Sequence, residues 1–406
     1  MSGALRGTVN LPGSKSESNR ALMIAAYGGF PLEADNLSEA HDTVLLKSLL
    51  SQVECPAAET PFTVDCEDAG SVARFMMAYL AGKPGTWLLT GSPRLCERPM
   101  TPLVDALRQL GADIAGERLP VIINGKRLSG GSIVLDASQS SQFASSLLMA
   151  APTLKEVVTL ELKGDLVSMP YVEMTLKMMH HFGVQTKRDG RVVTIAPQTY
   201  QPRSFTVTAD WSAASYWYEM MALGESGSML LKGLTANSLQ GDAAVADLFA
   251  KLGVDSEFLA EGVRISRTKT APLTDEEPLV FDFKNTPDLF PSVFVTCIAL
   301  NINSILIGVS TLKNKESDRI KSLITELSKI YTFINIVSDD KIIIEKSTIK
   351  VKQFDGSKVL FKTYGDHRIA MALAALRPQL GPLQFDAPSV VNKSYPRFWE
   401  ELEKVL

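Results

Sequence analysis

Several separate segments of the chain carry apolar residues at the spacing of an amphipathic helix. Three of them, 103–114, 175–186 and 245–256, share one layout, in which the helical pattern is followed by a glycine and then by the start of a strand. A glycine directly after a helix is typical of a left-handed cap, so this glycine predicts where each helix ends. Segments 43–53 and 319–336 show the same pattern without the glycine.

Two more apolar helices are predicted at 140–152 and 367–378. Each runs into a proline and is followed by a predicted strand, at 157–162 and 383–386 respectively. Helices that alternate with strands over short connections predict an α/β chain built from a repeated supersecondary unit. Because the repeat length is irregular, we expect several copies in each of two globular domains rather than a solenoid. A strand that leads into a new helix at 205–217 marks a plausible crossover between the domains.

The segment 289–312 contains no charged residue and could be mistaken for a membrane span. Pro291 and Gly308 interrupt it, and the sequence Asn-Ile-Asn-Ser at 301–304 is typical of a turn. We therefore expect a buried helix, a turn and a buried strand at 304–309, and no membrane helix.

The composition is that of a globular protein with no surface built for nucleic acid. The 406 residues are 45% hydrophobic and 21% charged, and the net charge is −4. Any site for an anion must therefore be a local concentration of cations. The N-terminus lacks the layout of a signal peptide, and the four cysteines form no Cys-x-x-Cys pair, which favours reduced thiols and a cytoplasmic protein. These cysteines are Cys55, Cys66, Cys96 and Cys297.

Common catalytic signatures are missing from the chain. There is no Walker A loop, G-x-S-x-G elbow, H-E-x-x-H motif or G-x-G-x-x-G fingerprint, and four histidines make a histidine metal site improbable. Instead, short polar stretches recur at helix starts and turns, most of them with Arg or Lys. They are "GSKSESNR" (13–20), "DAGSVAR" (68–74), "CERP" (96–99), "QSSQF" (139–143), "VSMPY" (167–171), "NTPD" (285–288), "KNKESDR" (313–319), "GDHR" (365–368) and "NKSYPR" (392–397). Helix N-terminal N–H groups together with Arg side chains predict a pocket for more than one small anion.

These stretches closely resemble the 5-enolpyruvylshikimate-3-phosphate (EPSP) synthase family. The resemblance rests on "LPGSKSESNRAL", "SSQFASSLLMAAP", "LKGDLVSMPY", "SLQGD", "KESDRI", "GDHRIAMALA" and "NKSYPRFWEEL", which follow the family order from about residue 7 to 402. It implies transfer of the enolpyruvyl group of phosphoenolpyruvate to the 5-hydroxyl of shikimate-3-phosphate, with release of phosphate and with no metal or organic cofactor. The small-molecule substrates would be the only partners, and the family suggests a monomer.

The resemblance also implies a fold. We expect the two-domain enolpyruvyl transferase fold, an inside-out α/β barrel in which each domain is built from three βαβαββ-like units. Residues 1–13 and 211–406 would form one domain and 14–210 the other, with the active site in the cleft between them.

The resemblance implies two overlapping sets of binding residues, which suit two substrates that each carry a phosphate and a carboxylate. Shikimate-3-phosphate would be bound by Ser16, Arg20, Ser140, Ser141, Gln142, Ser168, Tyr171, Asp288 and Lys315. Phosphoenolpyruvate would be bound by Lys15, Gly70, Arg98, Gln142, Arg319, Arg368 and Lys393. Gly70 would let the backbone approach the substrate and would leave room for the competitor glyphosate. Ser140 and Ser141 would also cap their helix.

Proton transfer is needed at two centres. By the resemblance, Asp288 would be the base at the 5-hydroxyl, Glu316 would exchange protons at C3 of phosphoenolpyruvate, and Lys15 would be a second acid/base. Two effects on the pKa of Glu316 oppose each other: desolvation would raise it, whereas Lys315 and Arg319 would lower it. The sequence leaves open which effect is larger. We also expect the arginines to repel one another in an empty site, and Ser18 to cap the first helix.

Some residues depart from the family pattern. Asp68 and Ser71 stand where many members have Asn and Thr, so Asp68 would instead pair with Arg74 or cap its helix. Thr311 replaces a usual Asn and is assigned no role, and Cys96 is interpreted as incidental. Three alternatives remain. The first is enolpyruvyl transfer to UDP-N-acetylglucosamine, which Ser16 disfavours, and the second is a catalytically silent anion-binding relative. The third is an RNA-end-modifying relative, which the acidic net charge disfavours.

Overall fold

The chain divides into two compact units, each described here by itself. The computed structural model describes residues 4–56, 60–267, 277–332, 335–338, 340–352 and 359–406. The terminal unit consists of Met1–Ser14 and Thr208–Leu406, and the inserted unit consists of Lys15–Val207. The boundaries between the units therefore lie after residues 14 and 207, close to the boundaries after residues 13 and 210 that we expected from the sequence.

The inserted unit contains two four-stranded sheets with the same pairing pattern. In each sheet a parallel pair is extended by two antiparallel strands, in the orders β3-β4-β6-β5 and β7-β8-β10-β9. The strands are β3 (Phe62–Asp65), β4 (Gly85–Thr90), β5 (Asp113–Ala115), β6 (Val121–Gly125), β7 (Gly131–Asp136), β8 (Val158–Lys163), β9 (Lys187–Asp189) and β10 (Val192–Ile195). The helices between them are α3 (Gly70–Gly82), the short α4 (Pro93–Glu97), α5 (Thr101–Gln109), α6 (Ser141–Ala150) and α7 (Met169–His181). Apart from α4, each repeat therefore reads βαβαββ.

A shorter third copy completes the inserted unit. Its sheet is reduced to one parallel pair, β2 (Ala34–Asp35) and β11 (Phe205–Thr206), which joins the two ends of the unit. Its helices are α1 (Lys15–Gly28) and α2 (His41–Glu54).

The terminal unit repeats this plan. Its two four-stranded sheets have the orders β1-β12-β14-β13 and β15-β16-β19-β18, again with one parallel pair in each, and β21-β22 is a short parallel pair. The strands are β1 (Leu5–Asn10), β12 (Gly227–Lys232), β13 (Val254–Leu259), β14 (Gly262–Arg267), β15 (Leu279–Asp282), β16 (Ser304–Ile307), β17 (Tyr331–Thr332), β18 (Asn335–Val337), β19 (Lys341–Ile344), β20 (Lys350–Val351), β21 (Leu360–Phe361) and β22 (Gln384–Phe385). Strands β17 and β20 form a short antiparallel pair. The helices are α8 (Trp211–Leu223), α9 (Val245–Ala250), α10 (Phe290–Ala299), α11 (Arg319–Leu327), α12 (His367–Ala374), α13 (Arg377–Leu380) and α14 (Phe398–Val405). The inserted unit enters the first repeat between β1 and α8.

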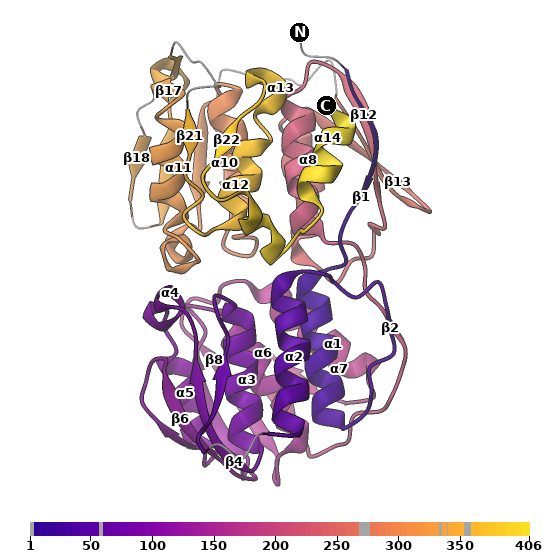
Figure 1. The fold of residues 1–406 in the computed structure, drawn as a ribbon, viewed down its shortest axis with the longest axis vertical. Helices are drawn as coiled ribbons and strands as arrows, with labels where there is room; N and C mark the ends of the chain where they lie inside the picture. Colours follow the sequence, from indigo (N-terminus) through magenta and orange to yellow (C-terminus); the bar gives the residue numbers. More distant parts are fainter. Residues whose placement is uncertain (1–3, 57–59, 268–276, 333–334, 339, 353–358) are drawn as a thin grey trace. The chain divides into compact units, whose positions relative to one another are not determined.

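In each unit three buried helices form the centre. Helices α1, α3 and α6 pack against one another in the inserted unit, and α8, α10 and α12 do so in the terminal unit (Figure 1). These helices are apolar around most of their circumference, which is the pattern of a helix without a solvent face. Strands such as β7 alternate buried and exposed residues, so the sheets lie outside the helices. This is the inside-out α/β arrangement expected from the resemblance.

Two of the three glycine-terminated helices end as the sequence predicts, whereas α9 already ends at Ala250 and Gly253, with a φ of 82°, lies three residues beyond it. After α5, Gly111 has a φ of 91°, and the N–H of Ala112 donates to the carbonyl of Leu107. After α7, Gly183 has a φ of 89°, and the following N–H makes the same bond to Met179. Both are Schellman caps, in which a side chain at the glycine would be strained.

The charge-free segment 289–312 folds as a helix, a turn and a strand. Helix α10 ends at Ala299, Asn301 adopts a left-handed φ of 56°, and β16 begins at Ser304. Within the described parts of the chain, no helix combines the length and the apolar character needed to cross a bilayer.

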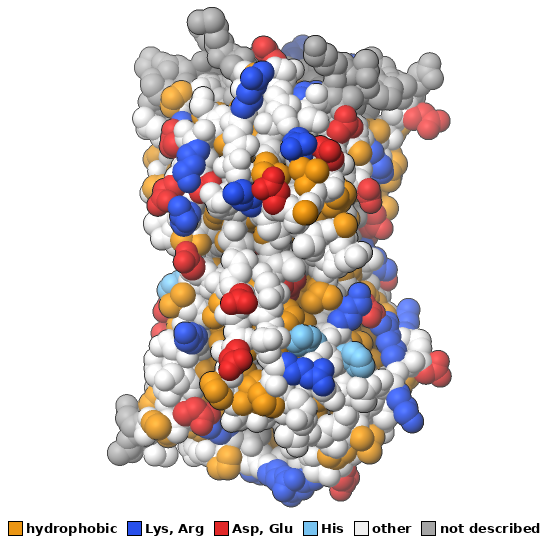
Figure 2. Space-filling view, turned by 90° about the vertical axis from the view of Figure 1, so that its right-hand side faces the viewer, with side chains coloured by type: hydrophobic (Ala, Val, Ile, Leu, Met, Phe, Trp, Pro, Cys, Tyr) orange, Lys and Arg blue, Asp and Glu red, His pale blue; other side chains and the backbone are white. Residues whose placement is uncertain are grey.

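The molecular surface mixes both signs of charge. On the face that Figure 2 shows, basic and acidic side chains are interspersed, and hydrophobic side chains are scattered among them. This face therefore presents no basic stripe of the kind that coats nucleic acid.

Candidate active site

The starts of the central helices carry most of the candidate residues. In the inserted unit, α1, α3 and α6 begin at Lys15, Gly70 and Ser141. In the terminal unit, Asp288 lies just before α10, and Arg368 lies in the first turn of α12. Unpaired N–H groups and the helix dipole make a helix start favourable for an anion, so these three helix starts in the inserted unit fit phosphate or carboxylate groups.

Lys15 is held by a carboxylate that the sequence analysis did not single out. Its Nζ lies 3.0 Å from Oδ2 of Asp42, whose side chain is 2% exposed. Asp42 is in the first turn of α2, where an acidic residue is ordinary, so its spacing gave no signal of a role. The ion pair fixes the ammonium group at the start of α1.

Arg20 is buried and is bound by neutral acceptors. Its guanidinium donates to Oγ1 of Thr175 at 2.7 Å, to the carbonyl of Ser16 at 2.9 Å, to Oγ of Ser145 at 3.1 Å and to the carbonyl of Tyr171 at 3.3 Å. Burial lowers the pKa of Arg20 to about 10. The side chain therefore ties α1, α6 and α7 together, and the charge of Glu17 acts against the effect of burial on its pKa.

Gly70 lies between two guanidinium groups. A Cβ atom at this position would be 2.5 Å from Nη1 of Arg98 and 2.6 Å from Nη1 of Arg74. Arg74 in turn donates to Oε1 of Gln142 at 2.9 Å, and Nε2 of Gln142 donates to Oγ of Ser71 at 2.8 Å. The structure thus brings three predicted residues together and adds Arg74, which the sequence analysis mentioned only as a possible partner of Asp68.

The serine pair and the Ser168–Tyr171 turn lie at the starts of α6 and α7. Ser140 is the N-cap of α6, and its Oγ accepts from the N–H of Gln142 at 3.3 Å, which confirms the predicted capping for Ser140, while Ser141 is the first residue of the helix. Ser141 is buried. Ser168 has a left-handed φ of 56° and its carbonyl accepts from the N–H of Tyr171. A left-handed non-glycine residue is strained, and such strain is often found at functional sites.

Arg319 is the centre of the candidate cluster in the terminal unit. It is 1% exposed, and its three nitrogens each lie 2.9 Å from a different carboxylate. These carboxylates are Asp288, Glu316 and Asp366. Arg368 does act against the charge of Arg319, as expected for arginines in an empty site, but the three carboxylates outweigh this repulsion and raise the pKa of Arg319.

Asp288 bridges Arg319 and Arg368. Nη2 of Arg368 lies 2.9 Å from Oδ2 of Asp288, and Nη1 of Arg368 lies 3.4 Å from the hydroxyl of Tyr216. Burial would raise the pKa of Asp288, but Arg368, Lys315 and Arg319 together hold it well below the usual range. In this state Asp288 is an ionised carboxylate and a weak base.

The remaining predicted cations lie near this cluster or in buried positions. The ammonium of Lys315 acts electrostatically on Asp288. Lys393 ends the short helix Pro388–Lys393 and is 8% exposed, so it is no ordinary surface lysine. Asp366 caps α12 and accepts from the N–H of Arg368, which makes it the positioning carboxylate of the "GDHR" motif.

Two local expectations are corrected. Helix α1 begins at Lys15, so Ser18 lies inside the helix and does not cap it, and its Oγ accepts instead from the N–H of Ser38. The cap residue of α3 is Ala69, so Asp68 is not the cap, and its carboxylate accepts from the hydroxyl of Ser92. The first turns of α1 carry polar residues up to Arg20 and the apolar run begins only at Ala21, which hid the true start of the helix.

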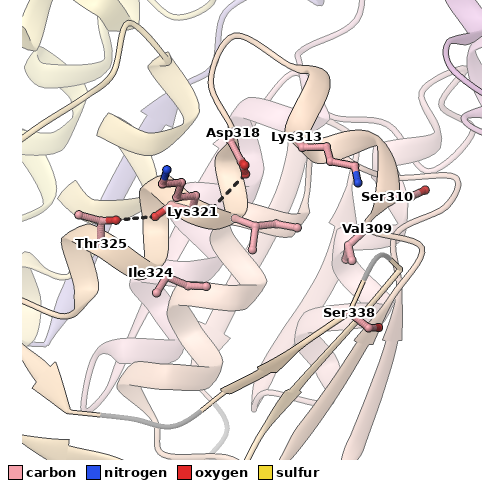
Figure 3. Close-up of a pocket in the computed structure, with 9 residues that line it drawn as sticks. Val309, Ser310, Lys313, Asp318, Lys321, Ile324, Thr325 and Ser338 are labelled. Carbon is pink, nitrogen blue, oxygen red and sulfur yellow. Dashed lines mark hydrogen bonds between the residues drawn. The ribbon is translucent and has the colours of Figure 1, made fainter.

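A pocket of about 650 Å³ lies elsewhere in the terminal unit. Its lining includes Lys321, Ile324 and Thr325 of α11 together with Val309 and Ser310, which Figure 3 draws as sticks. None of the predicted substrate-binding residues is among the described residues that line it. Arg319 starts the same helix but bonds to the carboxylate cluster, so this pocket is separate from the candidate site.

The comparisons with known proteins agree with this arrangement. A family model described as "EPSP synthase (3-phosphoshikimate 1-carboxyvinyltransferase)" matches residues 1–402. The chain is 39% identical to a 3-phosphoshikimate 1-carboxyvinyltransferase of Bacteroides fragilis, over 98% of this chain and 95% of the relative. It is 34% identical to the enzyme of that name from Photobacterium damsela subsp. piscicida, over 99% and 97%.

Solved structures show the same fold. An EPSP synthase from Acinetobacter baumannii superposes with a TM-score of 0.74 at 21% identity, over 99% of this chain and 96% of that one. The enolpyruvyl transferase NikO from Streptomyces tendae gives 0.75 at 14% identity, over 99% and 95%. With a family model that covers nearly the whole chain and relatives above 30% identity, the chain belongs to the EPSP synthase (3-phosphoshikimate 1-carboxyvinyltransferase) family.

Proposed function

We propose that this chain transfers the enolpyruvyl (carboxyvinyl) group of phosphoenolpyruvate to the 5-hydroxyl of 3-phosphoshikimate and releases phosphate. The observation that carries the proposal is the cluster around Arg319, in which two carboxyls suited to proton transfer, Asp288 and Glu316, are bonded to one buried guanidinium. A site that only bound anions would have no need of such carboxylates beside its cations.

The residues of the inserted unit would bind the anionic groups of the substrates. Lys15, Arg98 and Gln142 lie at or beside the starts of central helices, where phosphate and carboxylate oxygens find both N–H groups and cations. Gly70 would admit phosphoenolpyruvate because it places no side chain between Arg98 and Arg74. The predicted hydroxyls would complete the shikimate-3-phosphate site. They are Ser16, Ser140, Ser141, Ser168 and Tyr171.

Asp288 and Glu316 of the terminal unit would supply the proton chemistry, together with Lys15 of the inserted unit. The 5-hydroxyl gives its proton to Asp288 as its oxygen attacks C2 of phosphoenolpyruvate, while C3 gains a proton from Glu316 or Lys15. The tetrahedral adduct then loses phosphate, and the C3 methyl returns a proton. We propose that both sets of side chains act on one pair of substrates, as expected for a cleft between the domains.

Substrate binding would also activate Asp288. In the structure its pKa is held low, against burial, by Arg368, Lys315 and Arg319. Anionic substrate groups that bind to Arg368, Lys315 and Lys393 would compensate these charges and let the pKa of Asp288 rise towards the range of a useful base. Base strength would then appear only when both substrates are present.

Phosphate release from phosphoenolpyruvate tests the proposal. The measurement is made with 3-phosphoshikimate, with UDP-N-acetylglucosamine and with no acceptor. We expect release with 3-phosphoshikimate alone, together with a product that carries the carboxyvinyl group on the 5-oxygen by mass spectrometry and NMR. Release only with UDP-N-acetylglucosamine would contradict the proposal, and release with no acceptor would indicate a hydrolase.

A further inference from the structure

Asp242, in the "SLQGD" stretch, is a buried carboxyl outside the residues assigned so far. It is 2% exposed and lies in the short helix Gly241–Ala244, which packs on α8. One carboxylate oxygen accepts from the hydroxyl of Ser212. The other, Oδ1, is buried and has no hydrogen-bond partner among the residues that the structure describes. A buried carboxylate oxygen without a partner is costly, which points to a role other than stability.

The loop that carries Asp242 is fixed to the start of α8. The side chain of Gln240 accepts from the N–H of Trp211 at 2.9 Å and donates to the carbonyl of Ala209 at 2.8 Å and to Oγ1 of Thr208 at 3.0 Å. These bonds hold Asp242 at one place relative to α8.

Asp242 and Arg368 approach the same face of α8, one turn apart. Ser212 bonds to Asp242, and Tyr216, four residues further along the helix, has its hydroxyl 3.4 Å from Nη1 of Arg368. Arg368 is in turn paired with Asp288. We propose that Asp242 is a positioning residue for the reaction, whose charge acts on Asp288 and Arg368 across this face of α8 and makes Asp288 a stronger base. The inference rests on the proposed function.

The charges around Asp242 support this role. Burial raises the pKa of Asp242 to about 7, and the charges of Asp288 and Asp210 act in the same direction, while Arg368 and the bond from Ser212 oppose them. Like-charge repulsion is mutual, so an ionised Asp242 raises the pKa of Asp288 as well. Asp288 otherwise faces Arg368, Lys315 and Arg319, which lower its pKa. Asp242 therefore raises the pKa of Asp288 only above about neutral pH, where Asp242 itself is ionised.

The test is the pH profile of kcat at saturating substrates for the wild type and Asp242→Asn. The amide keeps the shape and an acceptor for Ser212 but removes the charge. We expect wild-type kcat to rise through about pH 7, and the variant to be lower by about three- to tenfold at pH 8.5 but similar to the wild type at pH 6. Asp247→Asn, an exposed change on the neighbouring α9, should follow the wild type.

A second variant tests the direction of the effect. Ser212→Ala removes the bond that lowers the pKa of Asp242, so the rise in kcat should move to higher pH. This variant also keeps the inference testable if Asp242→Asn does not fold. A constant ratio between Asp242→Asn and the wild type at every pH, or a rise that moves to lower pH in Ser212→Ala, would overturn the inference. A wild type that transfers nothing to 3-phosphoshikimate would instead contradict the proposed function, and the inference with it.

Discussion

Arg20 and Arg319 are both almost completely buried, yet their electrostatic surroundings are opposite. Arg20, in the inserted unit, is 3% exposed and donates only to hydroxyls and carbonyls, and burial lowers its pKa. Arg319, in the terminal unit, is bonded to three carboxylates, and although burial acts against it, these charges raise its pKa. The inserted unit thus bonds its buried cation to neutral groups, with Glu17 as an opposite charge that acts on it, whereas the terminal unit surrounds its cation with carboxyls that can exchange protons.

Removal of Arg319 should have the largest effect on stability. Arg319→Met leaves three carboxylates facing one another in a buried place, so we expect a loss of about 3–5 kcal/mol in the free energy of unfolding at pH 7. Because the pKa of Asp288 is lowered in the folded state, this stabilisation is present above the unfolded value of about 4 and is lost as the pH falls. Urea unfolding at pH 7 and at about pH 3, below that unfolded value, measures both.

Two further variants control for this result. Arg264→Met removes an exposed ion pair with Glu257 and should cost less than about 1 kcal/mol. Arg20→Met removes bonds to neutral acceptors, so its cost should change less between pH 7 and about pH 3 than the cost of Arg319→Met. A loss below about 1 kcal/mol for Arg319→Met, or equal pH dependence for Arg20→Met, would remove the contrast between the two arginines.

A substitution at Glu316 tests proton transfer independently of substrate binding in the terminal unit. Glu316→Gln keeps an acceptor for Arg319, at 2.9 Å in the wild type, but cannot donate or accept a catalytic proton at neutral pH. We expect kcat to fall by about 10²–10⁴-fold while the KM values change little. Glu257→Gln, on an exposed strand, should leave both constants unchanged. An unchanged kcat for Glu316→Gln would end its catalytic assignment.

Gly70 tests the inserted unit as an anion-binding surface. In Gly70→Ala the new methyl group would lie within 2.6 Å of both Arg98 and Arg74, so the flexible guanidinium groups must move. We expect the KM for phosphoenolpyruvate to rise by about tenfold, with a smaller change in kcat, because binding geometry is lost while the carboxyls are untouched. Gly82→Ala, at the other end of α3, meets no atom within 4 Å and should leave the KM unchanged. A normal KM for Gly70→Ala would contradict the close approach of substrate at this residue.

The sequence predicted the repeated architecture better than the details of charge pairing. Helix ends at Gly111 and Gly183 follow from local backbone preferences, so they could be predicted from single residues. Of the carboxylates on Arg319, Glu316 is its neighbour in the same turn of chain, whereas Asp288 and Asp366 come from distant segments that only folding brings together. The residue that neutralises Lys15, Asp42, looked like an ordinary first-turn acid for the same reason. Motif resemblance selected the candidate residues, but it could not show which of them are paired within the protein.

The smallest predicted effect concerns Glu219, a buried acid of the terminal unit that lacks the cationic partner of Glu316. It lies in α8 with 0% exposure, and across the described parts of the chain neither carboxylate oxygen has a hydrogen-bond partner. Burial raises the pKa of Glu219 well above its usual value, so the group is protonated when folded and ionised when unfolded at neutral pH. Folding therefore loses stability as the pH rises above about 4.3, the usual value for Glu.

Glu219→Gln removes this titration, because an amide stays neutral at every pH. We expect the variant to be more stable than the wild type by about 1–2 kcal/mol at pH 8, with the difference shrinking towards pH 5. Glu225→Gln, an exposed change two residues beyond the end of α8, should show no such trend in urea unfolding at the two pH values. A Glu219→Gln variant that is less stable than the wild type at pH 8 would mean that Glu219 is ionised and paired in the folded protein. Buried carboxylates elsewhere in the terminal unit would then also be paired with cations. The ion pairs at Arg319 would in that case no longer distinguish the candidate site from the rest of the unit.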